Sequence, residues 1–242
     1  MNRWQGKIAV VTGASSGIGL AIARALVREG MIVLGLARRK EKMEELMNDV
    51  EGNGKFYARK CDISDEVQVT DAFQWVKQNF GVVQIMVNNA GLTKSETSRS
   101  DWEAVFNVNV MGLLECTKQA VLVMKESDVE GYIININSIQ GHRVYSFGSL
   151  RSNVYAASKH AVTAITETLR NELLGTKIRV TSISPGLVKT EILANSGIDI
   201  SASNLPALDP EDIAESVLYA IRTPQRVQIT ELTIRPMGEH RS

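Results

Sequence analysis

The sequence has few cysteines and no long apolar run, and both absences exclude classes of protein. Only Cys61 and Cys116 are cysteines among its 242 residues. They fit no CxxC motif and no disulfide framework, so we expect free thiols in a reducing compartment and no metal site. No uncharged apolar run approaches the ~18 residues of a membrane helix, and the first residues lack the apolar core of a signal peptide. The sequence therefore favours a soluble, cytoplasmic protein.

An excess of charge of one sign is also missing. The 27 basic residues balance 27 acidic residues, while apolar residues make up 44% of the chain. Such a chain has no overall field to attract nucleic acid or an anionic membrane, so we expect a neutral or small-molecule ligand.

Short β-rich runs alternate with helical patterns along the whole chain. Several runs are apolar on both faces, as strands buried in a parallel sheet must be. This alternation predicts an α/β fold over 1–242, one doubly wound domain with helices on both faces. The predicted strands are 8–11, 31–37, 54–61, 83–87, 132–137, 177–184 and 227–234, and the predicted helices follow the first strand (Ile22–Glu29) and cover 65–79, 101–126, 154–174 and 210–222.

A glycine-rich turn follows the first predicted strand. Glycines there let backbone N–H groups approach a pyrophosphate, and the start of the next helix adds a favourable partial charge. The spacing is G-x-x-x-G-x-G rather than G-x-G-x-x-G, and a tight turn without a ligand is the alternative. The candidate residues are Gly13, Ser15, Ser16, Gly17, Ile18 and Gly19.

The end of the second predicted strand indicates which dinucleotide the chain prefers. Ala37 stands where an acidic residue would hold a ribose 2′-OH, and Arg38 and Arg39 follow it. A guanidinium accommodates a 2′-phosphate, so NADP(H) is favoured over NAD(H). The alternative is a basic turn exposed to solvent.

Tyr155 and Lys159 lie one helical turn apart on one face of a predicted helix. An adjacent ammonium stabilises a phenolate and lowers the phenol pKa, so that the pair could exchange a proton with a carbonyl oxygen. Taken alone, this pair is more typical of a helix surface.

The complete set of motifs resembles the short-chain dehydrogenase/reductase family. The glycine turn, the Asn-Asn-Ala-Gly segment 88–91, Asn109, Ser138, Tyr155 with Lys159, and a Pro-Gly pair occur in that order. The resemblance implies a Rossmann-like, seven-stranded parallel sheet. It also implies that Tyr155 is the catalytic acid/base, Lys159 lowers its pKa and binds the nicotinamide ribose, Ser138 holds the substrate oxygen, and Asn109, rather than Asn107, keeps a proton-relay water.

The same resemblance implies further cofactor contacts. Asp62 and Ile63 would lie at the adenine, while Asn89, Ala90 and Gly91 would lie along its ribose. The residues expected to face the nicotinamide are Pro185, Gly186, Val188 and Thr190.

Several segments, among them "FNVNVMG", "IININS", "GHRV" and "ISPGLV", resemble one subgroup of the family. It contains insect NADP-dependent farnesol dehydrogenases and a vertebrate relative that reduces ketosteroids. This resemblance implies a hydrophobic alcohol or carbonyl substrate, with loops 139–153 and 187–208 on the substrate side. The candidate substrate residues are Ser138, Gln140, Val144, Phe147, Tyr155, Leu187, Ile192 and Leu193, although plain packing explains Ile192 and Leu193 equally well.

Some alternatives stay open. The chain could be a ketosteroid or general carbonyl reductase, or a nucleotide-binding regulator without turnover. His142 is expected to pack near the site rather than to act in catalysis. The family resemblance implies that helices 101–126 and 154–174 form a homodimer or homotetramer interface, although burial in the core explains their apolar residues almost as well.

Overall fold

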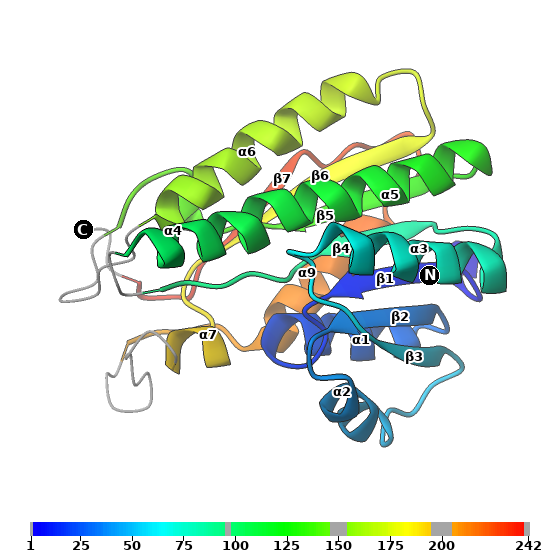
Figure 1. The fold of residues 1–242 in the computed structure, drawn as a ribbon, viewed down its shortest axis with the longest axis horizontal. Coiled ribbons are helices and arrows are strands. Elements are labelled where there is room, and N and C mark those ends of the chain that lie inside the picture. The colour runs from blue at the N-terminus through cyan, green and yellow to red at the C-terminus, as the bar shows by residue number, and fades with distance from the viewer. Residues whose placement is uncertain (1, 95–97, 146–153, 195–204, 240–242) are drawn as a thin grey trace.

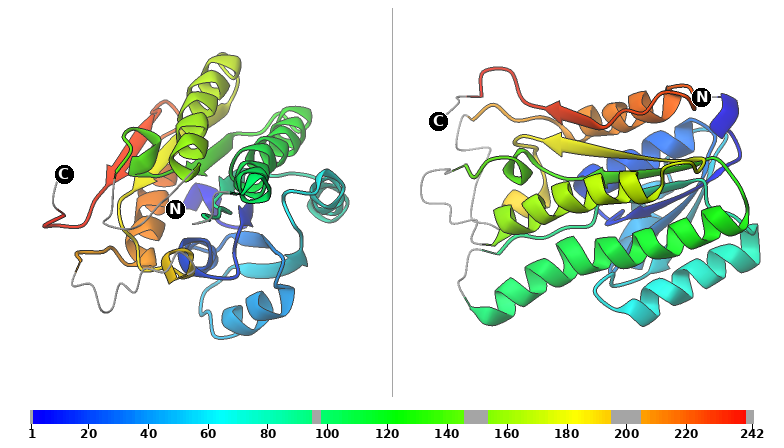
Figure 2. Two further views of the ribbon diagram at one scale, coloured as in Figure 1. Left: turned by 60° about the vertical axis from the view of Figure 1, so that its left-hand side comes forward. Right: turned by 90° about the horizontal axis from the view of Figure 1, so that it is seen from above.

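The computed structural model describes residues 2–94, 98–145, 154–194 and 205–239, which form a three-layer α/β fold (Figures 1 and 2). The middle layer is a seven-stranded sheet in the order β3-β2-β1-β4-β5-β6-β7, and every neighbouring pair of strands is parallel. The predicted fold class is therefore confirmed. The strands are β1 (Ile8–Thr12), β2 (Ile32–Ala37), β3 (Lys55–Lys60), β4 (Ile85–Asn88), β5 (Gly131–Ile136), β6 (Ile178–Pro185) and β7 (Glu231–Ile234).

Helices cover both faces of the sheet (Figure 2). One face carries α1 (Gly17–Arg28), α2 (Lys40–Met47) and α9 (Pro210–Arg222). The other carries α3 (Glu66–Phe80), α5 (Leu113–Glu126) and α6 (Tyr155–Glu172), with α4 (Arg99–Phe106) joined to α5 by the π-helical segment η2 (Asn107–Gly112). Three short elements complete the described chain: η1 (Asn2–Trp4), η3 (Ile139–Gly141) and α7 (Glu191–Ala194).

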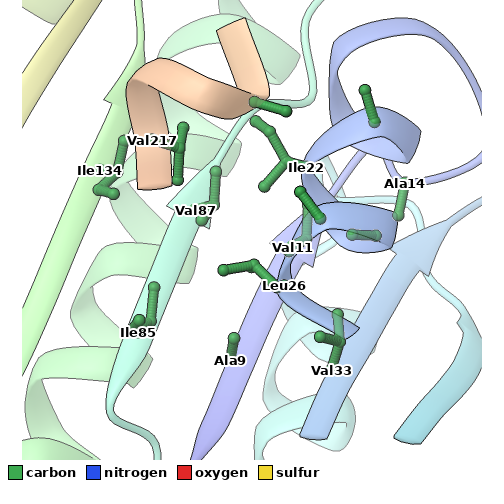
Figure 3. Packing of buried hydrophobic residues seen from close by; sticks show 14 of the residues in the cluster. Ala9, Val11, Ala14, Ile22, Leu26, Val33, Ile85, Val87, Ile134 and Val217 are labelled. Atoms are coloured by element: carbon green, nitrogen blue, oxygen red, sulfur yellow. The ribbon is translucent and has the colours of Figure 1, made fainter. Parts of the chain in front are cut away.

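The apolar runs of the sequence form the interior of this fold. Every residue of β1, β4, β5 and β6 is buried, as expected for strands with helices on both faces. Figure 3 shows Ile22 and Leu26 of α1 near Val11 of β1, with Val217 of α9 beside Val87 of β4. Because all the strands are parallel, their carboxyl ends lie at one edge of this packed sheet.

The helix predicted over 101–126 is the clearest difference from the sequence-based expectation. The structure begins it at Arg99 and interrupts it with η2. Helix α2 was not predicted, because charged residues dominate Lys40–Met47 and only Met43 and Met47 are buried. The predicted helix 210–222 has the same bounds as α9, where Asp209 and Pro210 mark the start.

Strand β7 is shorter than the predicted 227–234 because side chains replace part of its pairing with β6. The Gln228 side chain accepts a hydrogen bond from Val180 N at 3.3 Å and donates one to Val180 O at 2.7 Å. The Thr181 hydroxyl donates to Ile229 O at 2.6 Å. Regular backbone pairing between the two strands begins only at Glu231.

Within the described ranges, no helix combines the length and the apolar character needed to cross a membrane. The same residues contain no group of three or more His, Cys, Asp or Glu side chains placed to hold a metal ion.

Candidate active site

The carboxyl ends of β1, β2, β4, β5 and β6 open into one cleft with a volume of about 350 Å³. Because the strands are parallel, the loops that follow them meet at the same edge of the sheet, where α/β folds bind ligands. The predicted site residues that line this cleft are Gly13, Ser15, Ser16, Gly17, Ile18, Arg38, Arg39, Asp62, Ile63, Asn89, Ala90, Gly91, Ser138, Gln140, Tyr155, Lys159, Pro185, Gly186, Leu187, Val188, Thr190 and Ile192.

The glycine turn between β1 and α1 has the shape that a pyrophosphate requires. Gly13 has a φ of +69°, and a Cβ there would lie 2.9 Å from the Ala90 Cα. A Cβ on Gly19 would clash with Asn89 and with the backbone of Gly13. No side chain caps α1, and its first turn carries no acidic residue. The N–H groups at the start of α1 are therefore suited to an anionic ligand, and these residues fit a dinucleotide.

Thr12, which no sequence motif indicates, links the end of β1 to the segment that follows β4. Its buried hydroxyl accepts hydrogen bonds from the backbone N–H groups of Asn89 and Ala90, both at 3.0 Å. The Asn89 side chain in turn donates to Thr12 O at 2.9 Å. The end of β1 is thereby fixed to the segment after β4, a pairing that the sequence could not reveal because the partners lie 77 or more residues apart.

A buried polar network fixes the ends of β4 and β5. Asn88 Nδ2 donates to Asn135 Oδ1 and to Thr117 Oγ1, both at 2.8 Å. Asn135 Nδ2 donates to Thr166 Oγ1 at 2.9 Å. The network joins these strands to α5 and α6, so the segments carrying Ser138 and Tyr155 are held in fixed register.

Ser138, Tyr155 and Lys159 come together at the floor of the cleft. Ser138 follows β5, where its hydroxyl accepts a hydrogen bond from Gln140 N at 3.1 Å. Tyr155 begins α6, and Lys159 lies one turn further along it. The Lys159 Nζ donates to Ile136 O at 3.0 Å and lies 5.7 Å from the centroid of the Tyr155 ring.

Burial controls the protonation of this group. Desolvation raises the pKa of Tyr155 to about 12, while its hydrogen bond with Ser138 acts in the opposite direction. Desolvation lowers the pKa of Lys159 to about 8. A lowered tyrosine pKa was expected from the adjacent ammonium, but the net shift is upward, because burial raises the pKa of the phenol more than the Ser138 hydrogen bond lowers it. At pH 7 Lys159 is therefore mostly charged beside a neutral phenol.

Asn109 stands behind the cleft in the π-helical segment η2. Its Oδ1 accepts a hydrogen bond from Leu92 N at 2.8 Å, and its Nδ2 donates to Leu92 O at 2.9 Å and to Ser158 Oγ at 3.0 Å. The side chain therefore ties the segment after Gly91 to the first turn of α6, whereas Asn107 is exposed. Its role in a proton relay stays a prediction.

Arg38 and Arg39 both line the cleft beside the glycine turn. Arg39 Nη2 lies 3.3 Å from Ser15 Oγ, 3.2 Å from Ser16 Oγ and 2.9 Å from a carboxylate oxygen of Glu191. Both arginines are exposed, so the solvent-exposed basic turn stays open as an alternative.

The predicted substrate residues have different positions. Gln140, Leu187 and Ile192 line the cleft. Val144 does not line it and is 68% exposed. Phe147 and the side chain of Leu193 lie outside the described residues, so their roles stay predictions.

His142 lies beside the site without lining the cleft. Its Nε2 is 3.2 Å from Ser184 Oγ and also contacts a carboxylate oxygen of Glu231. The expected packing role agrees with this position.

The arrangement combines three chemical features in one cleft. A turn suited to phosphates lies at one end, cations lie beside it, and a buried phenol next to an amine and a hydroxyl lies at the other. Such a site can bind a dinucleotide and exchange a proton with an oxygen of a second ligand.

Comparisons with known proteins agree with this geometry. A family model described as short chain dehydrogenase matches residues 7–200. The chain is 51% identical to a farnesol dehydrogenase of Aedes aegypti, over 99% of each protein. It is 42% identical to human dehydrogenase/reductase SDR family member 11, over 98% of this chain and 96% of the relative. The family resemblance predicted from the sequence is confirmed.

Solved structures show the same fold. An alcohol dehydrogenase from the archaeon Thermococcus sibiricus, complexed with 5-hydroxy-NADP, superposes with a TM-score of 0.84 at 28% identity, over 98% of this chain and 100% of that one. The closed form of a serine dehydrogenase complexed with NADP+ gives a TM-score of 0.86 at 32% identity, over 97% of each chain.

Removing the Thr12 hydroxyl should destabilise the protein. The substitution Thr12→Val keeps the shape but leaves the backbone N–H groups of Asn89 and Ala90 without their acceptor, which should lower the free energy of unfolding by about 1–3 kcal/mol. Chemical denaturation measures the change. Thr12→Ser keeps the hydroxyl and serves as the control. Equal stability of the valine variant and the wild type would contradict this role for Thr12.

Proposed function

The chain belongs to the short-chain dehydrogenase/reductase family, and on that premise we propose that it is an NADP(H)-dependent oxidoreductase. It interconverts a hydrophobic alcohol and the corresponding aldehyde or ketone. The observation that carries this proposal is the grouping of Ser138, Tyr155 and Lys159 in the cleft that also contains the glycine turn and Arg39. A cytoplasmic location, expected from the sequence, belongs to the same proposal.

The cofactor would be held by the glycine turn at its pyrophosphate, by Arg38 and Arg39 at the 2′-phosphate, and by Lys159 at the nicotinamide ribose. Bound NADP(H) supplies or accepts the hydride. Asp62 and Ile63 would contact the adenine, and the remaining contacts would come from cleft residues 89–91, 185, 186, 188 and 190.

The chain itself positions the substrate oxygen and handles its proton. Ser138 would donate a hydrogen bond to a carbonyl oxygen, and Tyr155 would donate the proton that turns it into a hydroxyl. The raised pKa of Tyr155 keeps the phenol protonated at neutral pH, as a proton donor must be. The Lys159 ammonium near the ring would stabilise the phenolate that remains. Alcohol oxidation uses the same groups in reverse.

The similarity to a named relative supports an isoprenoid substrate for this chain. One relative over the full chain is named farnesol dehydrogenase, and the buried apolar side chain of Leu187 lines the cleft. An apolar pocket distinguishes chain shapes only weakly, so a ketosteroid or general carbonyl substrate is the second candidate. The third candidate is a protein without enzymatic activity, a regulator that binds NADP(H). The grouping of Ser138, Tyr155 and Lys159 argues against it.

A homodimer or homotetramer is also part of the proposal. Several large apolar side chains on the α4–η2–α5 surface are exposed, and a second copy could cover them. They are Trp102, Phe106, Met111, Leu114 and Leu122.

Replacing Tyr155 by phenylalanine should remove the proton donor and little else. We expect Tyr155→Phe to lower kcat by about 10²–10⁴-fold, while the affinity for NADPH, measured by fluorescence titration, stays within about twofold of the wild type. Tyr219→Phe, at an exposed tyrosine on α9, is the matched control. Turnover of the Tyr155 variant near the wild-type rate would refute the assignment.

The pH profile of kcat/KM should follow the titration of Lys159, because its pKa is lower than that of Tyr155. The lowered pKa means that Lys159 loses its positive charge as the pH rises through about 8, so kcat/KM for carbonyl reduction should decline above that value. Tyr155, with a pKa of about 12, keeps its proton throughout this range. In Lys159→Arg the charge persists, and the decline near pH 8 should disappear. A wild-type profile that stays flat up to pH 10 would contradict the requirement for the Lys159 charge.

A substrate panel tests the proposed function itself. Farnesol and farnesal, shorter terpenols, 3- and 17-ketosteroids and diketones would each be tested with NADP(H) and NAD(H). We expect the highest kcat/KM for farnesol or farnesal with NADP(H). Preferred turnover of ketosteroids would select the second candidate, and tight NADPH binding without turnover of any compound would favour the regulator.

A further inference from the structure

A three-residue ion cluster lies at the mouth of the cleft beside the glycine turn. Lys42 of α2 donates from Nζ to Glu191 Oε1 at 2.6 Å, and Arg39 donates from Nη2 to Glu191 Oε2 at 2.9 Å. Each carboxylate oxygen of Glu191 thus has its own cation. The cluster joins the start of α2, just after β2, to the first residue of α7, which is 149 or more residues further along the chain.

Glu191 is paired with the same cations that would bind a 2′-phosphate. Arg39 follows β2, where the fold places the 2′ position of the adenosine ribose, and the hydroxyls of Ser15 and Ser16 lie within 3.3 Å of the same guanidinium nitrogen. A carboxylate and a phosphate both accept charge-assisted hydrogen bonds from such a pair of cations. The cations hold the pKa of Glu191 at about 2, so its carboxylate is ionised at any physiological pH.

We propose that the 2′-phosphate of NADP(H), when it binds, replaces the Glu191 carboxylate as the partner of Arg39 and Lys42. This replacement is called the exchange below. This inference rests on the proposed NADP(H) dependence and adds two determinants of cofactor preference to it. Lys42 is a phosphate-binding cation, and Glu191 is a competing anion. NAD(H) carries no 2′-phosphate, so it leaves the three-residue cluster intact.

The exchange also connects cofactor binding with α7. Glu191 directly follows Thr190, whose Cγ2 would lie 3.0 Å from a Cβ on Gly17 of the glycine turn. Ile192, the next residue, lines the cleft. The ion pairs therefore attach the start of α7 to α2 across the glycine turn, and a 2′-phosphate would release that attachment.

The expected effects are moderate because the cluster is exposed. The side chains of Arg39, Glu191 and Lys42 are 52%, 46% and 34% exposed, and ion pairs in contact with water change affinities by only about two- to fivefold. The effects should also shrink as the ionic strength rises.

The test is calorimetric titration of the full chain with NADP+ and with NAD+ at low ionic strength. Glu191→Gln should lower the Kd for NADP+ by about two- to fivefold, and Lys42→Met should raise it by about the same factor. Neither substitution should change the Kd for NAD+ by more than about 1.5-fold. Glu44→Gln is the matched control, because Glu44 forms an exposed ion pair with Lys40 on the same helix as Lys42.

The double variant tests the exchange itself. With Lys42 already replaced, Glu191→Gln should improve NADP+ affinity less than it does in the wild type, because the two residues act on one phosphate. The adenosine 2′,5′-bisphosphate fragment should show the same pattern as NADP+.

Two outcomes would overturn the exchange, and they are distinguishable. If wild-type protein binds NADP+ no more tightly than NAD+, the proposed cofactor preference fails and the exchange fails with it. If wild-type protein prefers NADP+ but Glu191→Gln leaves that affinity unchanged, weakens it or shifts NAD+ equally, the exchange is wrong while the cofactor assignment stands.

Discussion

The hydrogen bond between Asn88 and Asn135 fixes the ends of two neighbouring strands, and the candidate site depends on it. The two residues are direct partners in the β4–β5 register, and both amides are buried. A buried amide without its partner costs free energy, so a shift of either strand would be penalised at once. The segment after Asn88 faces the glycine turn and that after Asn135 leads to Ser138, so this interaction, together with the β4–β5 pairing, fixes the nucleotide end of the cleft relative to its chemical end.

Sequence patterns predicted the parts of this molecule that depend on neighbouring residues. Buried strands such as β1 and β5 were visible as apolar runs, and Asp209 with Pro210 gave the start of α9. The patterns failed where distant contacts decide the outcome. The helix over 101–126 contains a π-helical segment where Asn109 bonds to Leu92 and Ser158, and α2 is mostly charged because only two of its side chains reach the core.

The same distinction holds within the site. The motifs along the chain predicted most of the residues that line the cleft, because parallel strands bring their carboxyl ends together, but Val144 does not line it. The direction of the Tyr155 pKa was predicted wrongly, since spacing shows a nearby ammonium but not how far the phenol is removed from water. The bond from Lys42 to Glu191 spans 149 positions, and nothing local in the sequence indicates it.

The Gln228 side chain, which replaces strand pairing beside β6, has a consequence for how molecules meet one another. β7 is an edge strand of only four residues, and without Gln228 the N–H and C=O groups of Val180 would be open to pairing. Unpaired backbone at a sheet edge is a template for another chain and a common origin of aggregation. By occupying both groups with a side-chain amide, the protein removes this part of β6 as a template for another chain.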